Sequence, residues 1–491
     1  MTAGVAAPSD RLDAAAWDAA TDQLVATLQE LIRIRSVNPV PPDAPDGELV
    51  AARRIAAMLR AAGLEPEIIE PVPGRGSVHV RLRGDGTGGE PLLLLSHLDV
   101  VPAPPERWSH DPFSGDLADG YVYGRGAVDM KSMVAMELAV IRLLAAEAQA
   151  AGLDPARDPI PGLRRDVLFT CTADEEAGGL VGAGWIVEHK PSWLQAAGAL
   201  NECGGVATTV AGRRLYPIQV AEKGYAAYRI AIRGTWGHGS MPRDDNAAVL
   251  AGAVIARLAS PGTTRLTPVM RRFLELAAAE LPPDAARILA GLASDDPLTA
   301  EAALAVACDP MYARALRALL RDTISPDVVH AGIKYNVIPG DAVVEVDCRV
   351  LPGTSEPAMR AELIERLGPA LAGVCQIELI IFGAPVEAPA HGPLFDLLVS
   401  TIREHDPEGF PLPVMAPFAT DAKHTKILGV PTYGFSPLKL DPDERFLERF
   451  HGVDERVAVD ALRWGLPVLY DVVRRFCGWA QPQKHLANRR D

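Results

Sequence analysis

Residues 92–132 read LLLLSHLDVVPAPPERWSHDPFSGDLADGYVYGRGAVDMKS. The four leucines at the start are bounded by polar and turn residues, a pattern that predicts a buried strand of a mostly parallel sheet. His97 and Asp99 follow where that strand ends, and catalytic groups collect at the carboxyl ends of strands in open α/β sheets. A Pro-rich loop and a Gly-rich turn then lead to Asp129, before a helical pattern over residues 131–150. Imidazole and carboxylate are ligands that a catalytic zinc prefers, so His97 and Asp129 are candidate ligands.

More carboxylates follow later strands. The strand expected at residues 166–171 ends in TADEEAGG, and its adjacent Glu175 and Glu176 cannot both point into one apolar core. One can bind a metal while the other acts as general base on a metal-bound water. Glu202, in ALNECGG, follows another expected strand end. The alternative interpretations are a buried core histidine and a helix cap for the first pair, a solvated acidic turn for DEE, and an ordinary loop glutamate for Glu202.

Composition limits the class of protein. A chain of 491 residues is too long for one typical domain. It has no run of eighteen apolar residues, so we expect no membrane span, and its net charge of −15 disfavours nucleic-acid partners. Six scattered cysteines without a CxxC pair argue against a disulfide framework and a cysteine zinc site. The N-terminus lacks the pattern of a secretion signal. We therefore expect a cytoplasmic protein.

The pattern of expected strands and helices changes twice along the chain. Alternating strands and helices of α/β type give way near residue 222 to segregated strands and helices, including an Ala/Leu-rich, mostly helical stretch at residues 265–322. The α/β texture resumes near Val386. This order predicts an α/β fold with a small inserted α+β domain. We place the catalytic domain at residues 1–218 and 385–491, and the inserted domain at residues 219–384.

The inserted domain contains three polar residues in suggestive positions. His238 lies between glycines, before a helix that we expect Asp244 or Asp245 to cap. Asn336 and Arg349 lie before and after the turn of an expected hairpin. The planar fork of an arginine can pair with both oxygens of a carboxylate. The alternatives are a turn residue for His238 and a surface ion pair for Arg349.

The motifs HLDVVP, GRGAVDMKS, DEEAGG, the Glu202 loop, GHGS, NVIPG, DCRVLPG, TDAKH and FHGVDER come in that order. In this order the chain resembles metallopeptidase family 20, the dinuclear zinc aminoacylases, glutamate carboxypeptidases, dipeptidases and succinyl-diaminopimelate desuccinylases. The stretch from Pro105 to Gly115 is similar to the carboxypeptidase S-like and fatty-acyl amino acid hydrolase branch. The resemblance covers nearly the whole chain and implies a mostly parallel catalytic sheet with a ferredoxin-like insert that serves as lid and dimerisation domain.

The resemblance also implies roles for the candidate residues. One zinc is held by His97, Asp129 and Glu202, and the second by Asp129, Glu176 and His451, with a cis peptide bond between Asp129 and Met130. Glu175 acts as general base and acid. Asp99 fixes the tautomer of His97 from its far nitrogen. Two departures bear on the ligands: Cys203 follows Glu202 where many relatives have glycine, and His424 in TDAKH competes with His451, which matches the family's last-ligand motif.

For the insert, the resemblance implies that His238 reaches the oxyanion in the site of a neighbouring subunit of a homodimer. Asn336 and Arg349 hold the carboxylate of the substrate. The expected function is a two-zinc hydrolase, with cobalt or manganese as other possible metals, that cleaves a peptide or N-acyl amide bond next to a free carboxylate. An inactive binding protein on the same fold is the alternative. A phosphoesterase fits less well, because a lone Arg349 suits a carboxylate better than a multiply charged phosphate.

Overall fold

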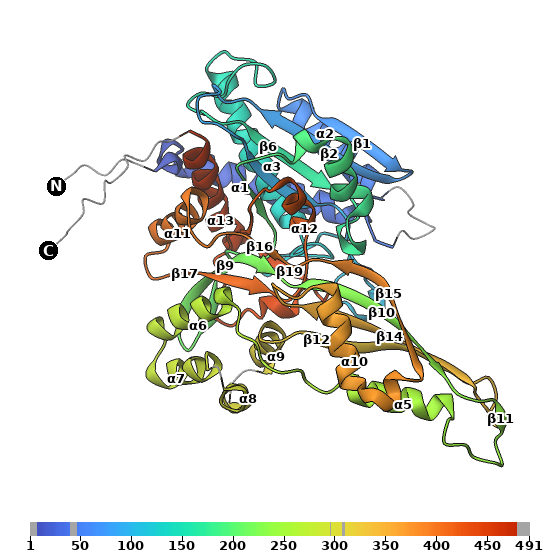
Figure 1. Ribbon diagram of the computed structural model, residues 1–491. Helices are drawn as coiled ribbons and strands as arrows, with labels where there is room; N and C mark the ends of the chain where they lie inside the picture. The colour runs from blue at the N-terminus through green and yellow to red at the C-terminus, as the bar shows by residue number, and fades with distance from the viewer. Residues whose placement is uncertain (1–6, 40–46, 295, 307–309, 479–491) are drawn as a thin grey trace. The chain divides into compact units, whose positions relative to one another are not determined.

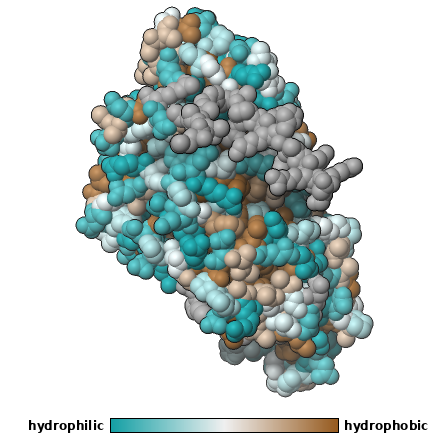
Figure 2. Space-filling model, turned by 90° about the vertical axis from the view of Figure 1, so that its left-hand side faces the viewer, coloured by the Kyte–Doolittle hydropathy of each residue, from teal (hydrophilic) through white to brown (hydrophobic). Residues whose placement is uncertain are grey.

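The computed structural model describes residues 7–39, 47–294, 296–306 and 310–478 (Figure 1). The chain divides into two compact units. The first unit comprises residues 1–219, 388–412 and 420–491, and the second comprises residues 220–387 and 413–419. None of the helices that the structure describes is long and apolar enough to cross a membrane. Teal, hydrophilic residues with smaller brown groups among them cover most of the face in Figure 2, as the 23% charged content leads one to expect.

The first unit is built on a mixed sheet with a parallel centre. Its neighbouring strands follow the order β1-β2-β6-β3-β7-β18-β9. The pairs β6–β3, β3–β7 and β7–β18 are parallel, whereas β1, β2 and β9 pair antiparallel. The strands are β1 (Glu67–Val72), β2 (Arg75–Leu82), β6 (Val167–Thr172), β3 (Leu92–His97), β7 (Gly198–Asn201), β18 (Thr432–Gly434), β9 (Arg213–Glu222) and β8 (Thr208–Val210). The predicted parallel sheet is thus confirmed, and β3 is buried along its whole length.

Helices cover this sheet and bury apolar stripes against it. The largest are α1 (Ala14–Arg33), α2 (Gly47–Ala61), α3 (Lys131–Ala150), α11 (Pro393–His405) and α13 (Val459–Cys477), with the short α4 (Trp185–His189) and α12 (Ala422–Thr425) between them. The side chain of Asp13 caps α1 by accepting a hydrogen bond from the Ala16 amide at 2.8 Å. A three-stranded sheet joins β4 (Leu117–Ala118), β5 (Tyr121–Tyr123) and β19 (Arg456–Ala458).

The second unit has an antiparallel sheet in the order β12-β14-β10-β15. Its strands are β12 (Thr323–Ala331), β14 (Asp341–Val350), β10 (Gly224–Arg233) and β15 (Cys375–Gly383), and α5 (Ala247–Leu258) and α10 (Glu356–Ala372) pack into a common core with them. Taken in chain order, this is the βαββαβ arrangement of a ferredoxin-like fold. Two short strands, β11 (Gly237–His238) and β13 (Val337–Ile338), pair with each other. The other strands of the described residues are β16 (Val386–Glu387) and β17 (Phe410–Ala416).

Four helices stand between α5 and β12, where the sequence predicted a mostly helical stretch. They are α6 (Pro268–Glu280), α7 (Pro283–Leu292), α8 (Pro297–Val306) and α9 (Pro310–Leu319). The expected cap of α5 was wrong. Asn246 caps this helix by accepting a hydrogen bond from the Ala248 amide, whereas Asp245 pairs with Arg243. Asn246 is the residue directly before the first turn, the position from which a short side chain reaches the second amide.

Candidate metal centre

The carboxyl ends of three neighbouring strands meet at one edge of the sheet in the first unit. His97 is the last residue of β3 and stands beside Thr172, the last residue of β6. Glu175 and Glu176 follow β6 within three and four residues, and Glu202 directly follows β7. The parallel register therefore delivers an imidazole and three carboxylates to the same edge.

Asp129 lies between the two histidines of this site. It precedes α3, and its peptide bond to Met130 is cis. One carboxylate oxygen of Asp129 lies 3.0 Å from His97 Nε2, and the other lies 3.3 Å from His451 Nε2. His451 Nε2 is also 3.1 Å from Glu176 Oε2, and His97 Nε2 is 3.7 Å from Glu202 Oε2. Asp129 thus has the position of a bridge between two sets of ligands.

The close grouping of these atoms fits a cation. Ligand atoms of His97, Asp129 and Glu176 lie within 4.8 Å of one another, and so do those of His97, Glu175 and Glu202. The buried Glu176 Oε1 accepts no hydrogen bond from the residues that the structure describes. A set of imidazoles and carboxylates with a buried oxygen left over is suited to zinc and related divalent ions. Geometry alone does not separate Glu175 from the ligands, because it belongs to one of the two groups.

The charges of the cluster shift the pKa values of its members. Burial lowers the pKa of His97, but Glu202, Asp129 and Asp99 outweigh burial and raise it well above its usual value. Hydrogen bonds to Asp129 and Glu176 raise the pKa of His451 to about 10. Burial raises the pKa of Glu202 to about 7 and that of Glu175 well above the usual range. The metal-free cluster therefore keeps protons at positions where metal ions would take their place.

Asp99 contacts both His97 and the loop of the two glutamates. His97 Nδ1 is 3.0 Å from the backbone carbonyl of Asp99 and 3.5 Å from its carboxylate, so Asp99 faces the far nitrogen of His97 as the resemblance implies. The carboxylate also accepts hydrogen bonds from the backbone amides of Glu175 and Glu176 and from the side chain of Asn38. Asp99 thereby holds the DEE loop beside β3.

Sequence reasoning missed several buried partners of the loops. Glu455 accepts hydrogen bonds from the amides of Val128 and Asp129 and pairs with Arg125. Similarly, Arg75 pairs with Glu48 and with Asp174, the residue before the twin glutamates. Glu455 lies in the motif FHGVDER and Arg125 in the motif GRGAVDMKS, so these two motifs could have indicated both residues. Nothing local marks Arg75 or Glu48.

Three non-glycine residues next to the site have left-handed backbone conformations. The φ angles are 74° for Asp174, 74° for Cys203 and 54° for His451. Such conformations cost on the order of 1–3 kcal/mol each and concentrate at functional sites. The positive φ angle of Cys203 explains why many relatives have glycine at this position, because glycine adopts such angles without steric strain. The structure brings His451 to the carboxylates, whereas His424 Nε2 donates a hydrogen bond to the Gly178 carbonyl.

The three candidates from the insert all lie in the second unit. His238 pairs with Val337 across β11 and β13, and the Gly239 amide donates to the Asn336 carbonyl, so His238 and Asn336 are neighbours. Arg349 lies near the other end of β14 and pairs through Nε and Nη2 with Asp347. Eight residues of strand, about 26 Å, separate Arg349 from Asp341, where β14 begins. Within one chain, Asn336 and Arg349 therefore do not reach the same carboxylate.

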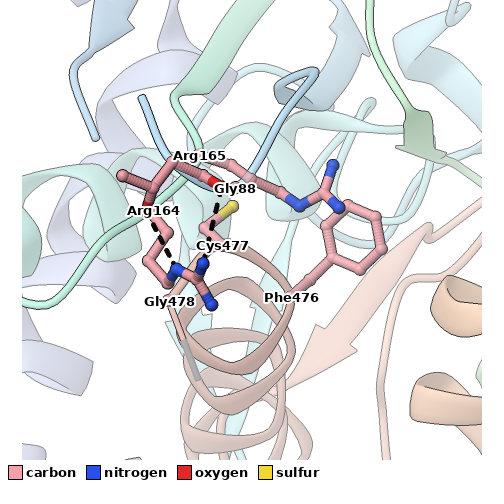
Figure 3. Close-up of a pocket in the computed structure, with 7 residues that line it drawn as sticks. Gly88, Arg164, Arg165, Phe476, Cys477 and Gly478 are labelled. Carbon is pink, nitrogen blue, oxygen red and sulfur yellow. Dashed lines mark hydrogen bonds between the residues drawn. The ribbon is translucent and has the colours of Figure 1, made fainter. Parts of the chain in front are cut away.

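A separate pocket of about 210 Å³ lies in the first unit (Figure 3). Its walls come from Thr87, Gly88, Arg164, Arg165, Phe476, Cys477 and Gly478. The Cys477 carbonyl accepts hydrogen bonds from the amides of Arg164 and Arg165, and the Arg165 guanidinium stacks on the Phe476 ring. Thr87 and Gly88 precede β3, Arg164 and Arg165 precede β6, and the other three residues lie at the end of α13. The pocket therefore lies at the amino-terminal ends of β3 and β6 and shares no residue with the metal-ligand cluster.

Comparison with known proteins identifies the family. Residues 93–475 match the model of peptidase family M20/M25/M40. The chain belongs to this family. The matched range contains every residue of the proposed metal cluster. Family M20 thus accounts for the motifs, and the chain is a hydrolase of peptide or amide C–N bonds.

Individual M20 relatives place the chain near two named groups. It is 27% identical over 406 residues to "Probable carboxypeptidase S-like 2" of Dictyostelium discoideum, covering 78% of this chain and 71% of that protein. It is 26% identical to the human N-fatty-acyl-amino acid synthase/hydrolase PM20D1, covering 82% and 78%. Among solved structures, the M20 metallo-carboxypeptidase Sso-CP2 of Sulfolobus solfataricus has the same fold, with a TM-score of 0.68, 16% identity, and coverage of 93% of this chain and 99% of that one.

Proposed function

We propose that this protein is a two-metal amidohydrolase that cleaves a peptide or N-acyl amide bond next to a free carboxylate, with Glu175 as general base. The observation that carries the proposal is the cluster at the carboxyl edge, where Asp129 lies between His97 and His451. The proposed ligands are His97, Asp129 and Glu202 for one ion and Asp129, Glu176 and His451 for the other. Zinc is the metal we favour, on the chemistry of this donor set.

The chemistry divides between the ions and the side chains. When bound, two divalent ions polarise the scissile carbonyl and lower the pKa of the attacking water. Glu175 accepts the proton of that water on a carboxylate oxygen and delivers it to the leaving nitrogen. The burial that raises the pKa of Glu175 suits a group that must first take up a proton and then release it.

The substrate-binding residues support a proposal of two chains per site. Arg349 has the planar fork that pairs with a carboxylate, and His238 can stabilise the oxyanion with Asn336 beside it. Arg349 and Asn336 are too far apart in one chain to share a ligand. We therefore propose a homodimer, in which one chain supplies Arg349 and the other supplies His238 and Asn336. The insert would then serve as lid and dimerisation domain.

The two-chain site predicts complementation between inactive chains. Arg349→Ala and His238→Ala proteins are each expected to hydrolyse substrate poorly. When they are mixed and refolded together, half of the dimers are mixed and one site of each is intact, so about a quarter of the wild-type activity returns. Absence of recovery in mixed dimers, verified with two affinity tags, would contradict the shared site.

The other features of the proposal concern compartment and substrate. No disulfide forms among the five cysteines that the structure describes, Cys171, Cys203, Cys348, Cys375 and Cys477, whereas Cys308 lies outside the described residues. This supports a reducing compartment such as the cytoplasm. The human relative named above acts on N-fatty-acyl amino acids, so these compounds belong in the substrate panel beside dipeptides and short N-acyl amino acids.

The test compares Glu175→Ala with wild type on that panel, after reconstitution with zinc. We expect turnover by wild type and a loss of about 10²–10⁴-fold in the variant with bound metal unchanged, the scale of general acid–base catalysis. Glu188→Ala, an exposed glutamate on α4, is the matched control. Equal activity of Glu175→Ala and wild type would exclude Glu175 as the base. A two-metal protein that turns over no panel member would overturn the substrate class.

A further inference from the structure

Three side chains of the TDAKH motif at the short helix α12 contact the end of β6 and the loop of the two adjacent glutamates. Asp421 accepts a hydrogen bond from Thr172 Oγ1 at 2.6 Å. Lys423 Nζ donates to Glu175 Oε1 at 3.0 Å, and His424 donates to the Gly178 carbonyl at 3.0 Å. The TDAKH motif therefore contacts the DEEAGG loop at Glu175 and Gly178, although none of these three residues has a part in the function proposed above.

The two adjacent glutamates must have different roles, one as a metal ligand and the other as the base. Glu176 contacts His451, as a ligand of the second ion must, but Glu175 also lies within ligand distance of His97 and Glu202. A carboxylate in that position can coordinate a divalent ion as readily as its neighbour. If Glu175 did so, the metal would draw electron density from its carboxylate and lower its affinity for a proton, so it would be a poorer base.

Lys423 is placed to resolve this problem. Its side chain is 8% exposed and that of Glu175 is 10% exposed, so the ion pair is shielded from water. A second donor of the ammonium bonds to the Thr420 carbonyl at 3.0 Å, which holds the amine in place. Asp421 lies 3.9 Å away and adds negative charge on the same side. The ammonium is thus anchored on α12 and presented to one glutamate of the pair.

We propose that Lys423 is a positioning residue that keeps Glu175 out of the metal coordination shell and so reserves it as the base. The proposal rests on the function proposed for Glu175. Charge-assisted hydrogen bonds are among the stronger ones, and this one competes with metal coordination for the same carboxylate. The position of one lysine then decides which of two adjacent, chemically identical side chains binds metal and which one moves protons.

The experiment replaces Lys423 and reads the coordination shell as well as the rate. Lys423→Met removes the ammonium, and Lys423→Arg keeps the charge. Lys426→Met makes the same chemical change at an exposed position three residues further on. Each protein is loaded with Co²⁺ for its visible absorption spectrum and with Zn²⁺ for kinetics and calorimetric titration. If the circular dichroism change of Lys423→Met on unfolding is a tenth or less of the wild-type change, this variant has a folding defect. Lys423→Gln then takes its place.

We expect a specific combination of results for Lys423→Met. The kcat falls about a hundredfold or more, KM changes little, the Co²⁺ spectrum changes, and Zn²⁺ binds at least as tightly because a further ligand has joined. Lys423→Arg and Lys426→Met keep the wild-type spectrum and stay within about tenfold of its kcat. In the double variant Glu175→Ala/Lys423→Met the spectral change disappears, because the carboxylate that would join the metal has been removed.

Other outcomes overturn the proposal. An unchanged Co²⁺ spectrum with a lower kcat would assign Lys423 a purely structural or proton-transfer role. A rise in KM alone would make it a substrate-binding residue, and wild-type behaviour would leave it no role in the reaction. Failure of the underlying function looks different, because an active Glu175→Ala protein would show it without any change at Lys423.

Discussion

The candidate ligands of the first unit and the candidate substrate residues of the second unit differ most in burial. The side chain of His97 is 2% exposed and touches three carboxylates, whereas His238 is exposed and hydrogen-bonds to Ser240, two residues away. Arg349 is 39% exposed and pairs with an equally exposed aspartate two residues away. The buried residues are connected by contacts between distant segments, and the exposed residues mainly by contacts with near neighbours.

This difference separates two kinds of site. A buried group of charged side chains is stable only when its members satisfy one another, so its geometry is largely built before any ligand arrives. An exposed residue has water as an alternative partner, and its final geometry depends on the ligand or on a second chain. Substitutions in the cluster should therefore change metal binding and stability together, whereas substitutions in the second unit should change substrate binding or turnover and leave metal binding and stability nearly unchanged.

The largest effect is expected for the bridge. Asp129→Ala removes the only residue that contacts both His97 and His451 among the described contacts, so metal binding and hydrolysis are lost together. In wild type, metal at about a thousand times its Kd stabilises the fold by about 4 kcal/mol, and the variant gains nothing. Thermal unfolding with and without zinc measures this. The exposed Asp284→Ala should keep the whole metal-induced shift, and a variant at Asp129 that keeps it would refute the bridge.

Asp99→Ala comes next, because it acts on the ligands through the backbone. The change leaves the part-buried amides of Glu175 and Glu176 without their acceptor, which costs up to about 1–3 kcal/mol for each amide. Metal affinity falls about 10–100-fold, as is usual when support of the ligands is lost. Calorimetric titration of zinc and urea unfolding measure the two effects. The exposed Asp85→Ala is the control, and a loss of stability without a loss of metal affinity would show that Asp99 only holds the loop.

These contacts show which parts of the fold and of the candidate site could be predicted from the sequence. Strand patterns and ligand chemistry are local, so the parallel sheet, the inserted α+β fold and the candidate residues His97, Asp129 and Glu176 could be named from short stretches. The partners within the site are not local. Lys423 and Glu175 are 248 residues apart in the chain, and Glu455 and Asp129 are 326 apart. No periodicity or motif spacing encodes which of many acids and bases meet across such separations.

The same reason explains what was wrong or imprecise. The cap of α5 depends on a single turn of backbone, because a shift of one residue leaves the sequence pattern unchanged. The distance between Asn336, which directly precedes β13, and Arg349, near the end of β14, was likewise not apparent, since both flank the same turn in the sequence. The ligand and substrate roles of these residues stay predictions.

His79 tests what burial alone does to a histidine outside the cluster. It stacks on Trp193 and hydrogen-bonds to Thr170, and burial lowers its pKa to about 3. Because the unfolded state binds a proton below about pH 6.5 and the folded state does not, stability falls as the pH drops through that value. The contribution is roughly 2 kcal/mol between pH 8 and pH 5. Urea unfolding in chelator should show a smaller pH dependence for His79→Phe by this amount, and an unchanged dependence would mean that His79 is protonated in the fold.

The smallest effect is expected for Arg349→Lys. The charge remains, but one of the two parallel hydrogen bonds to a carboxylate is lost, so we expect KM to rise about tenfold, or about 1.4 kcal/mol, with kcat and metal content nearly unchanged. Steady-state kinetics on the best panel substrate and metal analysis measure this. Arg229→Lys, which breaks a comparable exposed pair with Glu345 in the same sheet, should change neither constant. A loss of bound metal in Arg349→Lys would break the comparison, because an exposed residue of the second unit would then help to build the buried centre.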